Sequence, residues 1–243
     1  MTDLLSSKPI PVADRLIMAL DLPSIPQAQA LVEELGDAVG FYKVGLELFM
    51  AGDYFGLVEW LQARGKRVFV DLKFFDVPET VARAVRALSR RGVDFATVHG
   101  NDAIMEAAAR EKGDVKILAV TVLTSLDRGD LTDLGFACDV EQLVLSRARR
   151  ALQLGCDGVI SSGLEVRQLR AEVDSKLLVV TPGIRPVENR PSDDQKRVVT
   201  VDQAFRNGAD HIVVGRPIRD AADRRGAALA VQQTIADVFR TAR

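Results

Sequence analysis

The most informative segment of the chain is Arg67-Val68-Phe69-Val70-Asp71-Leu72-Lys73-Phe74-Phe75-Asp76-Val77-Pro78. Successive side chains of a β-strand point to opposite faces, so this segment would have one apolar face and one mixed face. The apolar face would carry Val68, Val70 and Leu72, and the mixed face Phe69, Asp71 and Lys73. Pro78 can open a helix, because its fixed φ and missing N–H are tolerated in a first helical turn. The segment therefore predicts a buried strand with two opposite charges at its C-terminal end, where parallel α/β proteins build active sites.

These charged residues also have an ordinary interpretation. Asp71 and Lys73 could form a solvated ion pair, and Asp76 could cap the helix that starts at Pro78. The segment alone does not separate the two interpretations, so the rest of the chain has to decide between them.

The same strand-then-helix pattern recurs along the chain. Strands are predicted at Arg15–Asp21, Phe41–Gly45, the segment from Arg67, Phe95–His99, Lys116–Thr124, Gly158–Ser162, Leu177–Thr181 and His211–Arg216. Helices are predicted from Pro23-Ser24 to about Leu35, from Glu47 to Arg64, from Pro78 to Arg91, from Asn101, through Leu154, after Gly163, from Val201, and from Ile218 to the end. Ser125–Asp139 and Val187–Arg197 are predicted to be polar loops.

Eight such units in 243 residues, without a linker or low-complexity tract, predict one (β/α)8 TIM barrel domain spanning residues 1–243. The nearly continuous apolar strands are what a parallel sheet covered on both faces requires. A doubly wound open sheet is the main alternative, but no Gly-x-Gly-x-x-Gly follows the first strand.

Composition narrows the function. The net charge is −2 and no Lys/Arg run occurs, so a nucleic-acid partner is not expected. Cys138 and Cys156 are too few for a disulfide framework, and the two histidines lack the spacing of a zinc site. No stretch approaches 18 apolar residues and the N-terminus does not resemble an export signal, so we expect a soluble, cytoplasmic protein without a membrane association.

Charged residues gather at the ends of the first three predicted strands. In a barrel these strands are neighbours, so Asp21, Lys43, Asp71 and Lys73 should converge at one rim with alternating signs. Because carboxylates favour the charged form of a nearby ammonium, we expect Lys73 to be a proton donor and not a Schiff-base lysine.

The loops after the seventh and eighth predicted strands carry phosphate-binding residue types. They contain Thr181-Pro182-Gly183-Ile184-Arg185 and Val214-Gly215-Arg216, with glycine N–H groups and two guanidiniums. These loops are the usual phosphate site of such barrels, so a phosphorylated small molecule is the expected ligand. Turn-forming glycines and surface arginines are the alternative interpretation.

Four other residues carry weaker signals. His99 could face the site, although a hydrogen-bonded barrel histidine is the more ordinary interpretation. His211 begins the eighth strand and is expected to be structural. Thr124 or Ser125 could bind a heterocycle, or bond to its own backbone as turn hydroxyls do.

The ordered set of motifs resembles the orotidine 5′-phosphate decarboxylase family in its bacterial form. The motifs are Ala19-Leu20-Asp21, Phe41-Tyr42-Lys43-Val44-Gly45, Asp71-Leu72-Lys73-Phe74-Phe75-Asp76-Val77-Pro78-Glu79-Thr80, Val122-Leu123-Thr124-Ser125, Thr181-Pro182-Gly183-Ile184-Arg185-Pro186, Asp194-Gln195-Lys196-Arg197 and Val214-Gly215-Arg216-Pro217. They cover essentially the whole chain.

The resemblance implies a homodimeric barrel, without cofactor or metal, that converts orotidine 5′-monophosphate to UMP and CO2 in pyrimidine biosynthesis. It implies that Lys73 protonates C6 of the pyrimidine within an array completed by Lys43, Asp71 and Asp76. It assigns Asp21 and Lys43 to the ribose, Thr124 to the pyrimidine, Asp76 and Thr80 to the partner subunit's site, and Arg185, Gln195, Gly215 and Arg216 to the phosphate. Residues 187–197 would then close over the site as a lid.

Two departures and two rival functions remain. Phe75 stands where the family usually has histidine, and Gly100-Asn101-Asp102 replaces a glycine-rich turn after His99.

One rival function is that of a Mg2+-dependent sugar-phosphate decarboxylase or synthase on the same barrel. These enzymes carry an acidic residue where Lys43 stands, and an ammonium at this position would repel Mg2+. The other is a catalytically inactive barrel that senses a phosphorylated ligand, which would not need the charged array.

Overall fold

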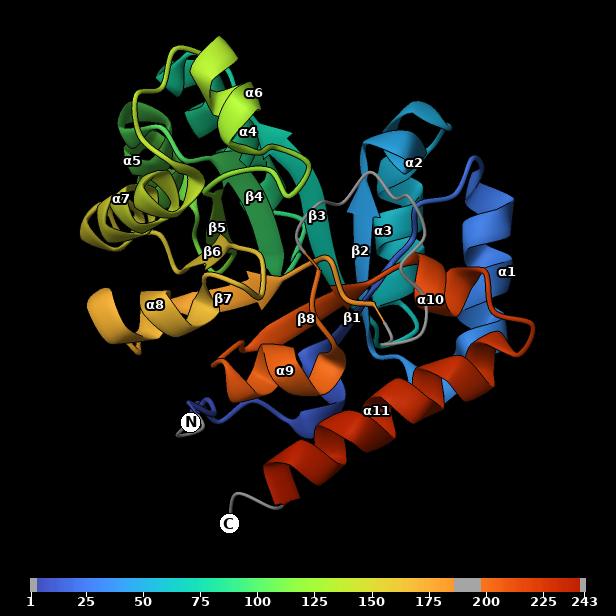
Figure 1. Ribbon diagram of the computed structural model, residues 1–243. Helices are drawn as coiled ribbons and strands as arrows, with labels where there is room; N and C mark the ends of the chain where they lie inside the picture. Colours follow the sequence, from blue (N-terminus) through green and yellow to red (C-terminus); the bar gives the residue numbers. More distant parts are fainter. Residues whose placement is uncertain (1–3, 186–197, 241–243) are drawn as a thin grey trace.

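The computed structural model describes residues 4–185 and 198–240. Eight parallel strands form a closed barrel in the order of the chain, with helices around it (Figure 1). Strand β1 closes the barrel, because Met18 pairs with Tyr42 of β2 on one side and with Val214 of β8 on the other. The predicted (β/α)8 barrel is confirmed.

The bounds of the elements are as follows. The strands are β1 (Leu16–Ala19), β2 (Phe41–Gly45), β3 (Arg67–Phe74), β4 (Phe95–His99), β5 (Lys116–Val120), β6 (Gly158–Ile160), β7 (Leu178–Thr181) and β8 (His211–Val214). The α-helices are α1 (Ile25–Leu35), α2 (Leu46–Met50), α3 (Tyr54–Gln62), α4 (Pro78–Ser89), α5 (Asp102–Glu111), α6 (Arg128–Asp133), α7 (Val140–Gln153), α8 (Val166–Glu172), α9 (Val201–Arg206), α10 (Arg216–Arg219) and α11 (Arg224–Arg240). Two 3-10 helices, η1 (Val12–Arg15) and η2 (Gly36–Ala38), complete the described elements.

The core has two layers, as strand alternation requires. A small cluster fills the barrel interior with inward-facing side chains from most strands: Ile17, Ala19, Phe41, Phe69, Phe95, Leu118, Leu178, Val180 and Val213. A larger cluster lies between the strands and the helices and includes Val68 and Val70. The predicted alternation of β3 is therefore present, with Phe69 inside the barrel and the valines outside.

The helix predicted from Glu47 to Arg64 is wrong in one respect, because the structure has two helices there. Helix α2 ends at Met50, and Gly52 adopts a φ of 141°, which favours glycine. The Asp53 carboxylate then accepts a hydrogen bond from the Gly56 N–H at 2.9 Å and caps α3. A glycine followed by a capping residue ends one helix and starts the next.

Other boundaries also differ from the prediction. The first strand ends at Ala19, the fifth at Val120, the sixth at Ile160 and the eighth at Val214, so the polar residues after them belong to the rim. The predicted loop Ser125–Asp139 contains α6, which an Asp127 and Asp130 capping box opens. The predicted last helix is two helices, α10 and α11. Residues 187–197 lie outside the described part of the chain.

No helix within residues 4–185 and 198–240 is both long enough and apolar enough to cross a membrane.

His211 lies at the N-terminal end of the barrel, opposite the expected site. Its ring is buried, packs edge-on against Phe41 and Phe95, and places Nδ1 2.9 Å from the Asp14 carbonyl oxygen. Burial lowers the pKa of His211 to about 4. The residue is a structural one, as expected from its place in the chain.

We predict that His211 makes folding sensitive to acid. The unfolded chain binds this proton near pH 6.5 and the folded chain only near pH 4, so stability is full above about pH 6.5 and falls as the pH drops through this window. The total loss is about 3 kcal/mol. Urea unfolding of wild type and His211→Asn between pH 7 and pH 4 measures it, and Asn can still donate a hydrogen bond toward Asp14. Equal pH dependence in both proteins would contradict the assignment.

Candidate active site

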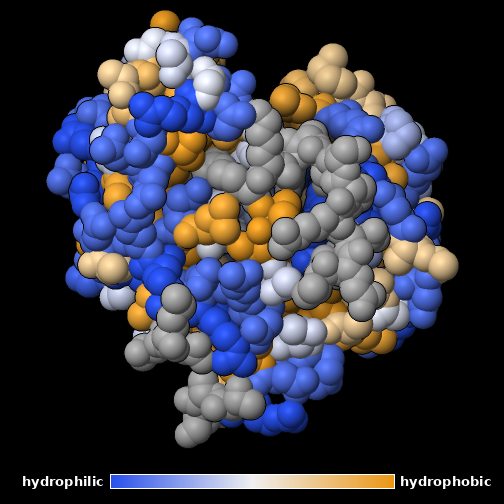
Figure 2. Space-filling model, in the orientation of Figure 1, coloured by the Kyte–Doolittle hydropathy of each residue, from blue (hydrophilic) through white to orange (hydrophobic). Residues whose placement is uncertain are grey.

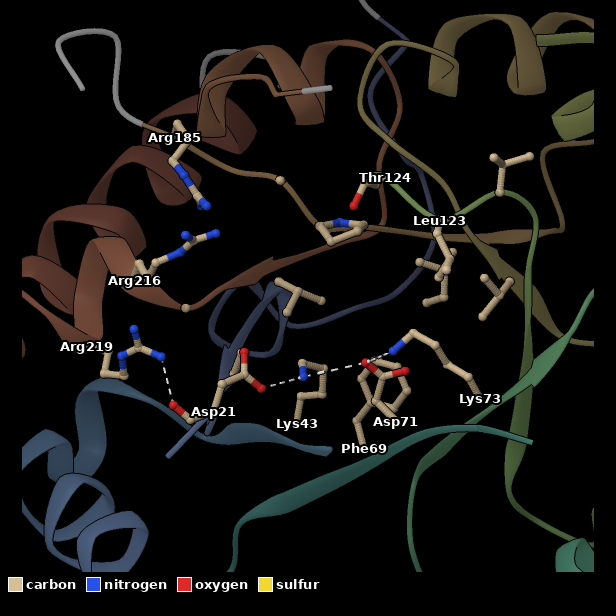
Figure 3. A pocket seen from close by; sticks show the side chains of 18 residues that line it. Asp21, Lys43, Phe69, Asp71, Lys73, Leu123, Thr124, Arg185, Arg216 and Arg219 are labelled. Atoms are coloured by element: carbon tan, nitrogen blue, oxygen red, sulfur yellow. Dashed lines mark hydrogen bonds and ion pairs between the residues drawn. The ribbon is translucent and has the colours of Figure 1, made fainter. Parts of the chain in front are cut away.

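The C-terminal ends of the strands surround a cavity of about 420 Å³ (Figure 3). Charged residues from the ends of β1, β2 and β3 line one side of it. Three guanidiniums from the segments after β7 and β8 line the adjoining side, next to Asp21, and an apolar wall that includes Leu123 lies across the cavity from them. The cavity therefore joins a charged floor, a cationic side and an apolar side.

The charged floor is a continuous row of alternating charges. Lys43 Nζ lies 2.9 Å from Asp21 Oδ1 and 3.5 Å from Asp71 Oδ2. Lys73 Nζ lies 2.9 Å from the same Asp71 oxygen. The structure thus brings together the four residues that the sequence placed at neighbouring strand ends.

Burial and charge pairing act against each other in this row. Burial alone would raise the pKa of Asp71, but Lys43 and Lys73 hold it below its usual range. Burial alone would lower the pKa of Lys43, but Asp71 and Asp21 raise it above its usual range. Both groups therefore stay charged at neutral pH.

An irregularity of β3 positions Asp71 and Lys73. Val70 pairs with Ala96 of β4, whereas Phe74 pairs with Val98, so the register shifts between them. Lys73 has a φ of 48°, and no other non-glycine residue in the described ranges has a positive φ. Such a bulge re-aims side chains, and strained backbone of this kind concentrates at functional sites.

Thr97 of β4 contacts both residues and was missed by the sequence analysis. Its Oγ1 donates to Asp71 Oδ1 at 2.8 Å and accepts from the Lys73 N–H at 2.9 Å. Strand alternation could have indicated this residue, because Thr97 lies two residues after Phe95 and therefore shares the inward face of β4.

The cationic side of the cavity contains the predicted Arg185, Gly215 and Arg216, and also Arg219. Arg219 donates to the backbone oxygen of Asp21 at 2.7 Å and pairs with Asp220 at 2.7 Å. Sequence analysis missed Arg219, although it follows Arg216 by three residues and shares its helical face on α10. A phosphate could be bound here by guanidiniums.

The apolar side of the cavity includes one of the two candidate hydroxyl residues. Thr124 lines the cavity, and Ser125 is not among the lining residues. Val122, Leu123 and Ile160 lie on the same wall. This surface could pack against a flat heterocycle, with the Thr124 hydroxyl available for hydrogen bonding.

Three of the candidate residues lie outside the cavity or outside the described chain. Asp76 and Thr80 are exposed and do not line the cavity. Asp76 accepts a hydrogen bond from the neighbouring Val77 N–H at 2.6 Å, but the N-cap of α4 is Val77, without a side-chain cap bond. The interpretation of Asp76 as the cap of α4 is therefore wrong. Gln195 lies outside the described residues.

His99 is half-buried and does not line the cavity. Its ring packs against Phe75, with 4.6 Å between ring centroids, where a hydrogen-bonded barrel histidine was expected. Burial and the charges of Arg147 and Lys73 lower the pKa of His99, so the ring is neutral at pH 7. Phe75, which stands where the family usually has histidine, therefore packs against the His99 ring.

Comparison with known proteins agrees with this geometry. Residues 14–231 match the model of the "Orotidine 5'-phosphate decarboxylase / HUMPS family". An orotidine 5′-phosphate decarboxylase of Methylococcus capsulatus is 78% identical over 98% of this chain and 99% of its own, and one of Stenotrophomonas maltophilia is 50% identical over 97% and 99%. The crystal structure of the Lactobacillus acidophilus orotidine 5′-phosphate decarboxylase is 36% identical and covers 91% of this chain and 99% of its own, with a TM-score of 0.80.

We predict that Lys43→Met destabilises the fold, because the buried Asp71 carboxylate would keep only one of its two cations, the more exposed Lys73. Breaking a buried ion pair costs about 3 kcal/mol or more, measured here as the free energy of unfolding in urea at pH 7. Lys112→Met is the matched control, since the ion pair between Lys112 and Asp157 is about a quarter exposed and should contribute less than about 1 kcal/mol. Equal losses in the two variants would contradict the buried-charge account.

Proposed function

The chain belongs to the orotidine 5′-phosphate decarboxylase / HUMPS family, and we propose that it converts orotidine 5′-monophosphate to UMP and CO2 with Lys73 as proton donor. The observation that carries this assignment is the row Asp21, Lys43, Asp71 and Lys73 on the floor of the cavity. It places an ammonium group within reach of the cavity and holds it there by a buried carboxylate.

The charge row suits the chemistry of this reaction. When the bond between C6 and the carboxylate carbon breaks, CO2 leaves and the electron pair stays on C6 of the pyrimidine. A cation that is already in place offsets this charge without solvent reorganisation. Lys73 supplies the cation and then its proton, which bonds to C6 and gives UMP. Asp71 keeps the ammonium in position, because its carboxylate is 2.9 Å away.

The remaining cavity residues would bind the rest of the nucleotide. We assign Asp21 and Lys43 to the ribose, Asp71 to the reacting end of the nucleotide beside Lys73, and Thr124 to the pyrimidine. Arg185, Gly215 and Arg216 would bind the phosphate on the cationic side of the cavity, where guanidiniums line it. Gln195 is assigned to the phosphate by resemblance alone.

A magnesium-dependent sugar-phosphate enzyme is the rival within the same family. Mg2+ needs oxygen ligands, but the space between Asp21 and Asp71 holds the Lys43 ammonium, 2.9 Å and 3.5 Å from their oxygens. In the part of the chain that the structure describes, no group of three or more His, Cys, Asp or Glu side chains could hold a metal ion. The position of Lys43 therefore favours decarboxylation without a metal.

We also propose a homodimer with shared sites. Apolar side chains are exposed after the neighbouring strands β2 and β3: Leu46, Phe49, Met50, Phe75 and Val77. Met50 is 79% exposed and Phe75 64%, and hydrophobic residues gather over α2 in Figure 2. A partner packed on this rim would bury them and bring Asp76 and Thr80 toward its own cavity.

The same proposal includes one domain for residues 1–243 and a cytoplasmic location. Helix α11 packs against α1, η1 and α9, which ties the end of the chain to its beginning. Cys138 and Cys156 are free thiols, as a reducing compartment allows.

We predict that the purified protein consumes orotidine 5′-monophosphate after treatment with EDTA, since Lys73 supplies the cation that faces the developing charge. The loss of substrate absorbance and the release of CO2 measure the reaction. Lys73→Ala is the negative control for a contaminating decarboxylase. Activity that EDTA abolishes and only Mg2+ restores would favour the sugar-phosphate enzyme instead.

We predict that mixing two inactive variants restores activity if sites are shared. Lys73→Ala and Asp76→Ala should each be nearly inactive as homodimers. A heterodimer has one site with both residues and one with neither, so random exchange of equal amounts should restore about one quarter of wild-type activity. Steady-state rates after subunit exchange provide the measurement, with exchange itself followed by mass spectrometry of differently tagged chains.

The matched control for this experiment is the mixture of Lys73→Ala with Asp71→Ala. Both residues come from one chain of each site, so every site of the heterodimer lacks one of them and no activity should return. Proven exchange without rescue in the first mixture would remove Asp76 from the partner subunit's site.

A further inference from the structure

The hydroxyl group of Thr97 connects the two charged residues that the proposed reaction uses most directly. Thr97 is fully buried on β4 and does not line the cavity, so it does not touch a bound substrate. Its oxygen lies 2.8 Å from Asp71 Oδ1 and 2.9 Å from the backbone nitrogen of Lys73.

The directions of these two hydrogen bonds follow from the donors present. An ionised carboxylate only accepts, and the Lys73 N–H only donates. The single hydroxyl proton of Thr97 must therefore go to Asp71, and a lone pair of the same oxygen accepts the Lys73 N–H. No rotation of the hydroxyl satisfies both partners in another way.

Both carboxylate oxygens of Asp71 then have hydrogen-bond partners. Oδ1 accepts from Thr97, while Oδ2 accepts from Lys73 Nζ at 2.9 Å and faces Lys43 Nζ at 3.5 Å. This arrangement fixes the rotation of the carboxylate about its bond to Cβ. The hydrogen bond from Thr97 to Oδ1 therefore fixes the position of Oδ2, the oxygen that binds the Lys73 ammonium.

The backbone of Lys73 also depends on this contact. Between Val70 and Phe74, β3 has three residues where β4 has only Thr97, so the regular ladder is interrupted. Lys73 leaves the strand conformation with a φ of 48°, and its N–H bonds to a side chain of β4. Thr97 fills the gap that the bulge creates, which keeps this uncommon conformation paired.

We propose that Thr97 is a positioning residue for decarboxylation, which sets the Asp71 carboxylate and the Lys73 backbone so that the Lys73 ammonium points into the cavity. This inference rests on the proposed function, because it takes Lys73 as the proton donor. Thr97 acts through Asp71 and Lys73 and leaves the ribose and phosphate contacts unchanged.

The test uses two pairs of variants that differ only in the hydroxyl: wild type against Thr97→Val, and Thr97→Ser against Thr97→Ala. Misplacing a reacting group by about 1 Å lowers rates up to about 100-fold, so we expect kcat to fall about 10-fold to 100-fold in Val and Ala. KM and the Kd of UMP should change less than about threefold, because the remaining binding contacts are kept. Ser should stay within about threefold of wild type.

Thr121→Val is the matched control. Thr121 is also fully buried, and its hydroxyl donates to the Ile160 carbonyl oxygen at 2.8 Å, away from the charged row. Its kcat should equal that of wild type. If Thr97→Val does not fold, the Ser and Ala pair carries the same comparison, with folding checked by circular dichroism.

A wild-type kcat in Thr97→Val would overturn the proposal, and if Thr97→Val does not fold, the same holds for Thr97→Ala. A Thr97→Ser variant as slow as the variants without a hydroxyl would also overturn it. Hydrogen exchange at the Lys73 amide reads the contact without turnover. Protection should be lost in whichever of Val and Ala folds and kept in Ser, and unchanged protection would also overturn the proposal. A wild-type protein without decarboxylase activity would instead refute the proposed function.

Discussion

The Asp71 carboxylate is the group on which the site depends. It is almost fully buried, and a buried anion is unstable unless cations and hydrogen-bond donors surround it. Lys43, Lys73 and Thr97 meet this requirement from β2, β3 and β4. Three neighbouring strands must therefore keep their register for one carboxylate to stay charged, and the same requirement holds the Lys73 ammonium at the cavity.

The two ends of the barrel use buried charge for different purposes. Near the N-terminal end, fully buried Asp210 pairs with Arg170 at 2.6 Å and with Lys8 at 3.1 Å, and these contacts fasten the N-terminal segment to β8. No part of that cluster lines the cavity at the other end. At the C-terminal end, the paired charges border open space where a substrate can enter. This separation of stability from chemistry is typical of barrels of this kind.

Much of the fold and part of the site follow from local patterns in the sequence. The alternation of β3 placed Asp71 and Lys73 on one face, and the order of the strands brought Asp21 and Lys43 beside them. Thr97 could not be assigned, because its contacts depend on the bulge between Val70 and Phe74, and strict alternation does not predict a bulge. The break before α3 was missed because the apolar pattern continues across Gly52. The role of Asp76 does not follow from the structure of one chain, since its side chain is exposed there.

The central claim is that the positive charge of Lys73, held by Asp71, drives the loss of CO2. The most direct measurement is the kcat of Lys73→Met, which keeps the length and apolar stem of the side chain without its charge, together with the Kd of UMP. A fall in kcat on the order of 1,000-fold with UMP still bound is expected, because both electrostatic stabilisation and proton donation are lost. A kcat within about tenfold of wild type would contradict the account.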